Sequence, residues 1–181
     1  AFLPDPGARA DHWFLGWNEL ADGSGAYFTA KTKVYGDLTF YAQWVRFYTI
    51  DFDSQGGTAV ADQHRLWGEL VTKPQGPTRG GYVFDGWFHD AACIIPYDFA
   101  TEAVSDSKTL FARWDPLYTV SFNSQGGSAV PAQSVRNGSH TAVPTYDPTR
   151  SNHVFEGWFH DAACLTPYDF TVEIVSGDIT L

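Results

Sequence analysis

The sequence predicts a mainly β protein, α+β at most, built from small tandem modules of about 70 residues. The strongest evidence is a stretch at Tyr48–Gly57, YTIDFDSQGG, which returns as YTVSFNSQGG at Tyr118–Gly127. A second motif, GWFHDAAC, occurs at Gly86–Cys93 and again at Gly157–Cys164. Within the first stretch apolar residues alternate with polar ones, which is typical of a half-buried strand.

The repeat divides the chain into three modules. Residues 1–46 fit the C-terminal part of a first repeat, because Gly16-Trp17 aligns with Gly86-Trp87 at an offset of 70. Residues 47–116 form a complete second repeat, and residues 117–181 form a third repeat that lacks its last strand. Modules this small need rich cores. Aromatic residues, 17% of the chain with 7 Trp, can supply them.

The modules are joined by three-residue connectors, Val45–Phe47 and Asp115–Leu117. These connectors are apolar or contain proline, unlike flexible Gly/Ser-rich linkers. We therefore expect successive modules to keep a fairly fixed relative orientation. In the third copy Leu181 aligns with Leu110, so this copy stops before its counterpart of Phe111–Trp114.

The elements of the middle repeat follow one another in a simple order. A strand begins at Tyr48 and ends at a turn or bulge around Gln55–Gly57. A second extended segment is expected at 59–66, and Asn137-Gly138 is a hairpin signal at the corresponding end in the third repeat. The remaining elements are a loop at 73–81, a strand at 82–88 with Gly86 as a bulge, a short helical turn within 91–104 and a closing strand at 109–114.

The formal net charge of the chain is −10. An acidic surface argues against binding to nucleic acid or to anionic membranes, both of which attract basic patches. No apolar stretch approaches the 18 residues that a spanning helix needs, so we expect no membrane insertion of this segment.

Taken together, the motifs resemble a known family. The S-x-G-G end of the first strand is followed by Pro77–Arg79, then by G-Y-x-F-x-G-W-F at Gly81–Phe88, by Y-D-F, and by T-L-F-A-R-W at Thr109–Trp114. This pattern resembles the Listeria–Bacteroides repeat, the B-repeat of internalin-type bacterial surface proteins. The resemblance implies β-grasp-like modules in tandem, in secreted or cell-wall-attached proteins, and it offers no catalytic residues.

A motif of His, Asp and Cys recurs in two repeats, as His89, Asp90 and Cys93 and as His160, Asp161 and Cys164. A His and a Cys four positions apart can ligate zinc or form a nucleophile–base pair. Two ligands per module leave a metal site half built, and the first repeat has Glu19 and Gly23 at the His and Cys positions. We therefore predict no catalytic residues, no metal and no cofactor, and we interpret the motif as a turn.

Carboxylates recur at Asp98 and Glu102 and at Asp169 and Glu173. An acid/base pair of the glycosidase kind needs a deep cleft, for which a small module has little room. We expect Asp98 to accept hydrogen bonds from nearby backbone amides at the start of a turn.

The tryptophans fall into two groups. Those at shared module positions are expected in the core, and they are Trp17, Trp87 and Trp158 at one position and Trp44 and Trp114 at another. Trp13 and Trp67 have no Trp counterpart in the other copies, so they are candidates for exposed contacts.

The sequence thus predicts a non-catalytic segment of a bacterial surface or secreted protein, extracellular, acting as a stalk, spacer or adhesion region. Its expected partners are the adjacent repeats of the same protein, together with a host or matrix ligand. One alternative is self-association into a filament or oligomer, because incomplete modules expose strand edges that another chain can complete. The other alternative is a glycan-binding accessory module that stacks sugars on exposed Trp rings.

Overall fold

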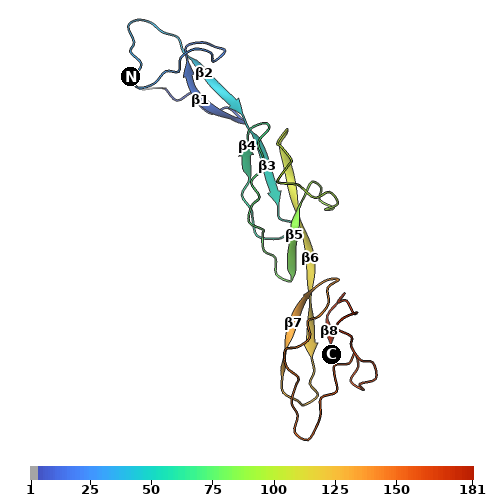
Figure 1. Ribbon diagram of the computed structural model, residues 1–181. Coiled ribbons are helices and arrows are strands. Elements are labelled where there is room, and N and C mark those ends of the chain that lie inside the picture. Colours follow the sequence, from blue (N-terminus) through green and yellow to red (C-terminus); the bar gives the residue numbers. More distant parts are fainter. Residues whose placement is uncertain (1–3) are drawn as a thin grey trace. The chain divides into compact units, whose positions relative to one another are not determined.

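The computed structural model describes residues 4–181, and this range holds eight strands and no helix (Figure 1). The expectation of a mainly β protein with tandem repeats is confirmed. The first three residues of the predicted module 1–46 lie outside the described residues. The strands are β1 (His12–Asn18), β2 (Tyr41–Arg46), β3 (Tyr48–Asp53), β4 (Gln63–Arg65), β5 (Tyr82–Phe88), β6 (Lys108–Phe122), β7 (Val130–Arg136) and β8 (Ile179–Thr180).

The chain packs into two compact units that are not the three predicted modules. One unit joins the described residues up to Ser54 with Ala59–Gln75 and Trp87–Phe111, and the other joins Gln55–Thr58, Gly76–Gly86 and Ala112–Leu181. The boundary between the units runs through the middle repeat. The link between the first and second repeats therefore lies inside one unit, and the link between the second and third repeats lies inside the other. The module boundaries themselves stay a prediction.

In the middle repeat the first and last strands are neighbours. β3 pairs antiparallel with β4 and parallel with the start of β6, from Ile50 opposite Lys108 to Asp53 opposite Phe111 (Figure 1). Parallel neighbours need a long crossover, and residues 54–107 provide it. Ile50 and Leu110, one from each strand, are both 0% exposed and stand at the centre of the core.

The third repeat uses the same strand arrangement. The second half of β6 pairs antiparallel with β7 and parallel with β8, where Val120 lies opposite Ile179. Its core gathers side chains from these strands and from the loops between them, and the buried members are Val120, Val130, Val135, Trp158, Tyr168, Val175 and Leu181.

The expectations about the smaller elements are met in part. The segment 91–104 forms no helix, but it holds a single turn of the helical kind, in which the Glu102 N–H donates to the Asp98 carbonyl at 3.0 Å. The Asp98 side chain caps the start of this turn through the Ala100 N–H. The connector 115–117 is not a separate link, since it lies inside β6, and only Phe47 separates β2 from β3. The expected strand at 59–66 forms only as β4, although its counterpart in the third repeat, β7, is seven residues long. The β-grasp-like character of the modules stays a prediction.

Candidate functional site

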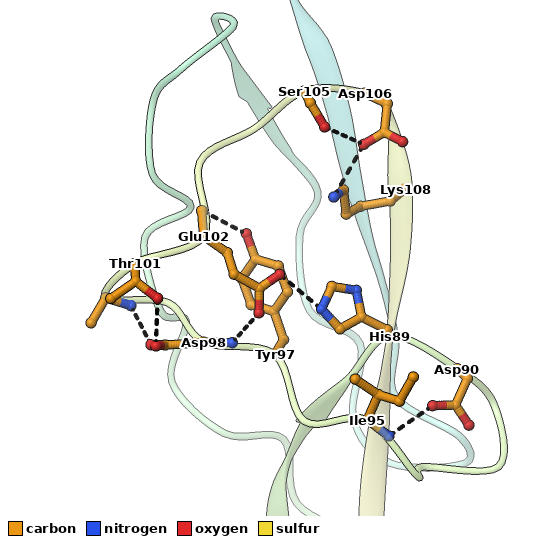
Figure 2. Close-up of polar contacts among 11 residues, drawn as sticks. His89, Asp90, Ile95, Tyr97, Asp98, Thr101, Glu102, Ser105, Asp106 and Lys108 are labelled. Atoms are coloured by element: carbon orange, nitrogen blue, oxygen red, sulfur yellow. Dashed lines mark hydrogen bonds and ion pairs between the residues drawn. The ribbon is translucent and has the colours of Figure 1, made fainter.

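The His-Asp-Cys motif folds into a turn that an aspartate closes. The Asp90 carboxylate accepts the backbone N–H of Ile95 at 3.0 Å (Figure 2). It also accepts the backbone N–H of Ile94 at 3.2 Å. Asp161 does the same in the third repeat, with Thr166 at 2.9 Å and Leu165 at 3.2 Å. A carboxylate that accepts backbone amides is stabilised in its charged form.

The cysteine of the motif occupies a backbone position that favours glycine. Cys93 and Cys164 have φ angles of +54° and +55°, and Gly23 of the first repeat has +79° at the same module position. The Cys93 thiol is engaged by its own turn, since its Sγ donates to the Ala91 carbonyl at 3.8 Å. In the third repeat Gln125 Nε2 donates to Cys164 Sγ at 3.4 Å.

This backbone position yields a first prediction. Cys93→Gly should leave the free energy of unfolding nearly unchanged, because relief of about 1 kcal/mol of left-handed strain is offset by the entropy of glycine, about 0.5–1 kcal/mol. Cys93→Val should destabilise the repeat by about 1 kcal/mol or more, since a β-branched residue tolerates a positive φ poorly. Urea unfolding of the two variants measures both effects, and equal losses would contradict the assignment.

The histidine of the motif pairs with a glutamate from the following turn. His89 Nε2 lies 2.8 Å from Glu102 Oε2, and Glu102 Oε1 accepts the backbone N–H of Asp98 at 2.8 Å (Figure 2). The His89 ring also meets the edge of the Tyr97 ring, with centroids 5.1 Å apart. One glutamate thus ties two turns together.

The third repeat repeats this arrangement nearly atom for atom. His160 Nε2 lies 2.7 Å from Glu173 Oε2, and Glu173 Oε1 accepts the backbone N–H of Asp169 at 2.9 Å. The first repeat has Glu19 and Thr32 at the two positions, so the His and Glu are present together or replaced together. This joint presence or replacement indicates that each of the two side chains is there to bind the other.

The predicted turn role of Asp98 is confirmed. Its carboxylate accepts the backbone N–H of Ala100 at 2.8 Å and the Thr101 hydroxyl at 2.6 Å (Figure 2). Over residues 4–181 the structure gathers no three His, Cys, Asp or Glu side chains that could hold a metal ion. The recurrent polar residues are therefore placed to shape turns.

We expect these turns to make the stability of the protein sensitive to acid. Hydrogen bonds, chiefly from Ile95 to Asp90 and from Thr166 to Asp161, lower the pKa of both carboxyls below 3.8. A lowered pKa adds stability above the unfolded-state value, and this stability is lost as the pH falls through the folded-state value. We expect the urea midpoint to fall between about pH 5 and about pH 2. The double variant Asp90→Asn and Asp161→Asn should show a shallower fall, and an unchanged pH profile would refute the role of these turns.

The first repeat builds the same turn without the aspartate. Asn18 is 0% exposed, and its amide nitrogen donates to the carbonyls of Gly23 at 3.1 Å and Gly25 at 2.8 Å. Its amide oxygen accepts the backbone N–H of Leu20 at 2.9 Å. The sequence comparison missed Asn18, because it lies one position before the His-Asp-Cys motif.

The tryptophans separate much as expected. Trp87 and Trp158 are buried, while Trp17, Trp44 and Trp114 are half-buried. Of the two candidates for exposed contacts, Trp67 is 73% exposed, and Trp13 is 40% exposed with its ring against Phe47. A ligand contact at either residue stays a prediction.

The link between the first and second repeats is aromatic. The Phe47 backbone N–H donates to the Asp11 carbonyl at 2.9 Å. The Phe47 ring contacts Trp13 of the first repeat, with centroids 5.1 Å apart, and His64 of the second repeat, at 4.4 Å. One ring therefore packs against side chains from both repeats.

The link between the second and third repeats is ionic. The Leu117 N–H donates to the Gly81 carbonyl at 2.8 Å, and this backbone hydrogen bond is the counterpart of the one that Phe47 makes at the first link. Arg136 of the third repeat donates through Nε to Asp115 at 2.7 Å, and its Nη2 binds both Asp115 and Asp85. The hydrogen bond to Asp85, and to a smaller extent the one to Asp115, raises the pKa of Arg136.

A groove of about 540 Å³ opens in the third repeat. It is lined by the turn after β6, by residues 153–159 and by Leu181. The counterpart of 153–159 in the middle repeat is β5, which pairs with β6, whereas residues 153–158 form no strand. The groove therefore lies where β5 joins the sheet in the middle repeat.

The fold and the links define a tandem array of small β repeats that are joined without loops. Comparison with known families agrees, since the model of the Listeria-Bacteroides repeat domain matches residues 1–43, 48–113 and 118–181. The chain belongs to the Listeria-Bacteroides repeat family.

Three relatives show where such repeats occur. A protein of Evansella cellulosilytica named as a Gly-rich membrane protein is 38% identical over 93% of this chain and 20% of its own length. A second protein of that organism, named as a membrane protein, is 32% identical over 98% of the chain and 27% of its own length. Internalin H of Listeria monocytogenes is 33% identical over 62% of the chain and 21% of its own length.

The chain thus spans about a fifth to a quarter of the length of these relatives. Along residues 4–181 no helix is long and apolar enough to pass through a bilayer.

Proposed function

We propose that this chain is a non-catalytic spacer segment of an extracellular bacterial surface protein, in which stiffly joined repeats hold another part of the protein at a distance. The observation that carries the proposal is the absence of loops at the two links between repeats. A single residue separates β2 from β3, and β6 runs from the second repeat into the third. The family match and the relative internalin H support a place in a surface protein.

The polar residues fit this role. His89 and Glu102 bind each other, and Asp90 accepts backbone amides of its own turn. Side chains that are engaged in shaping turns keep each small repeat in one conformation. A spacer needs this rigidity and needs no reactive group.

Two native thiols allow a direct test of the stiffness. Cys93 and Cys164 hold equivalent positions in successive repeats, so spin labels on both report the distance between the second and third repeats. Pulsed electron resonance of the labelled chain should give a single narrow distance distribution. A broad distribution would remove the basis for a spacer role.

An insertion provides the control. Placing Gly-Ser-Gly-Ser-Gly between Pro116 and Leu117 interrupts β6 and introduces a flexible linker. This variant should broaden the distribution while both repeats remain folded. If the insertion leaves a narrow distribution narrow, then β6 is not the source of the stiffness.

The groove in the third repeat favours a second candidate, strand exchange between chains. It lies beside residues 153–158, which form no strand although their counterpart β5 pairs in a sheet, so a sheet edge of another chain can take them up as an added strand. The candidate predicts that light scattering gives a mass that rises with protein concentration. A mass that stays at one chain over the whole range would exclude it.

A further inference from the structure

The two links between repeats share their backbone bonds but differ in side chains at three equivalent positions. At the constant offset of 70, the ionic residues Asp85, Asp115 and Arg136 correspond to the apolar residues Leu15, Val45 and Leu66. The first two positions belong to the earlier repeat of each pair, and the third position belongs to the later repeat. All three change character together within one chain.

We propose that these three positions determine which repeats fit next to each other. In this pairing code, the side chain at the third position, in the later repeat, must match the two side chains of the earlier repeat. The partner that each face takes is thus another repeat with a defined residue at the third position. The pairing rule does not depend on the spacer role.

Geometry places the three positions around the link. Arg136 lies opposite Leu117 in the β6–β7 register, and Asp115 lies two residues before Leu117. The side chains of Asp85 and Asp115 are only 27% and 22% exposed, and Arg136 binds both. One guanidinium from the later repeat therefore closes the gap between two carboxylates of the earlier repeat.

Two members of the apolar set lie at the first link by the strand register. Val45 lies opposite Trp13 in the β1–β2 register, two residues before Phe47. Leu66 follows Arg65, which lies opposite Tyr48. Val45 and Leu66 are both half-buried, whereas Leu15 is 55% exposed.

A mismatch between the earlier and the later repeat is unfavourable at both links, whether an ionic side chain is replaced by an apolar one or the reverse. A leucine at position 136 would remove the cation that bridges Asp85 and Asp115, and it would leave Arg113 to bind Asp85 alone. An arginine at position 66 would find Leu15 and Val45 where its carboxylate partners should be. Partly exposed ion pairs add little stability, so the matched set chiefly excludes wrong neighbours rather than strengthening the right one.

The third repeat carries an acidic residue at the first of the three positions. Glu156 stands at the position of Asp85, at an offset of 71. The code predicts that this face accepts a repeat with Arg or Lys at the position of Arg136. It also predicts that the face rejects a repeat with leucine there, such as the second repeat with Leu66.

The test compares a broken set with a converted set in the full chain. Arg136→Leu should lower the urea midpoint of unfolding, because it breaks the ionic set. Adding Asp85→Leu and Asp115→Val to it should restore the midpoint, because the set then equals that of the first link. In the reverse direction Leu66→Arg should destabilise, and Leu15→Asp with Val45→Asp should rescue it.

Two controls separate the code from ordinary loss of contacts. Arg113 binds Asp85 at 3.3 Å from within the same repeat, so Arg113→Gln, the residue of the first repeat, should change the midpoint less than Arg136→Leu does. Added salt should lower the midpoint of the ionic set and leave the converted set unchanged. A converted triple variant no more stable than Arg136→Leu would overturn the proposal, as would equal effects of Arg113→Gln and Arg136→Leu.

Discussion

Ile50→Ala is expected to lower the free energy of unfolding by about 2–5 kcal/mol, the range for isoleucine to alanine in a packed core. Ile50 is 0% exposed and lies on β3 between β4 and the start of β6. Removing three carbons there leaves a cavity between the central strands that the paired backbones cannot collapse to fill. Small domains are stable by only about 5–15 kcal/mol, so the middle repeat should unfold at a clearly lower urea concentration.

A second isoleucine in the same repeat is the matched control. Ile94 is 75% exposed on the turn that Asp90 closes. Ile94→Ala makes the same chemical change at the surface and should shift stability by less than about 0.5 kcal/mol. If both substitutions cost the same, the core does not lie where β3 and β6 meet.

Trp158→Ala should cost about 3–5 kcal/mol in the third repeat, the range for removing a buried aromatic ring. The Trp158 ring is 7% exposed and packs edge-on against Phe122 and Phe155, with centroids 4.8 Å and 5.2 Å apart. Loss of the ring removes the centre of that cluster. The third repeat should then unfold before the second, which separates the urea transition into two steps.

Trp67→Ala provides the control for this substitution. Trp67 is 73% exposed, so its removal should leave both steps within about 0.5 kcal/mol of the parent values. The tryptophan fluorescence of each variant reports the steps. A single unshifted transition in Trp158→Ala would show that this ring does not hold the third repeat together.

Much of the fold was predictable because the chain repeats itself. The strand that begins at Tyr48 and the strand at 82–88 form as expected, since alternating apolar residues mark them without help from distant contacts. In the first repeat a register shift lies between Phe14 and Gly16, and Gly16 is the counterpart of Gly86, where the sequence predicts a bulge.

What the sequence hid depends on side chains that meet across turns. Nothing in the local pattern shows that Asp90 turns its carboxylate back onto the backbone amides of Ile94 and Ile95. Pro116 likewise suggests a break, because proline is rare inside sheets. It is nevertheless accommodated in β6, where its carbonyl accepts the N–H of Asn137 at 2.9 Å.

The candidate sites were less predictable than the strands. The link between His89 and Glu102 could have been found by noting that both residues are replaced together in the first repeat. The joint replacement of Asp85, Asp115 and Arg136 by apolar residues at the first link indicates an ionic contact in the same way. Residues that co-vary among copies in one chain therefore carry structural information that single motifs lack.

The parallel pairing of β3 with β6 determines how a repeat responds to mechanical tension. When the array is pulled along its chain, the load enters the middle repeat at the start of β3 and leaves it through β6. These two strands are direct neighbours, matched from Ile50 opposite Lys108 to Asp53 opposite Phe111. The load therefore acts along the strands, and the hydrogen bonds between them are sheared together rather than opened one at a time. In a repeat built in this way, all the hydrogen bonds between β3 and β6 resist extension together.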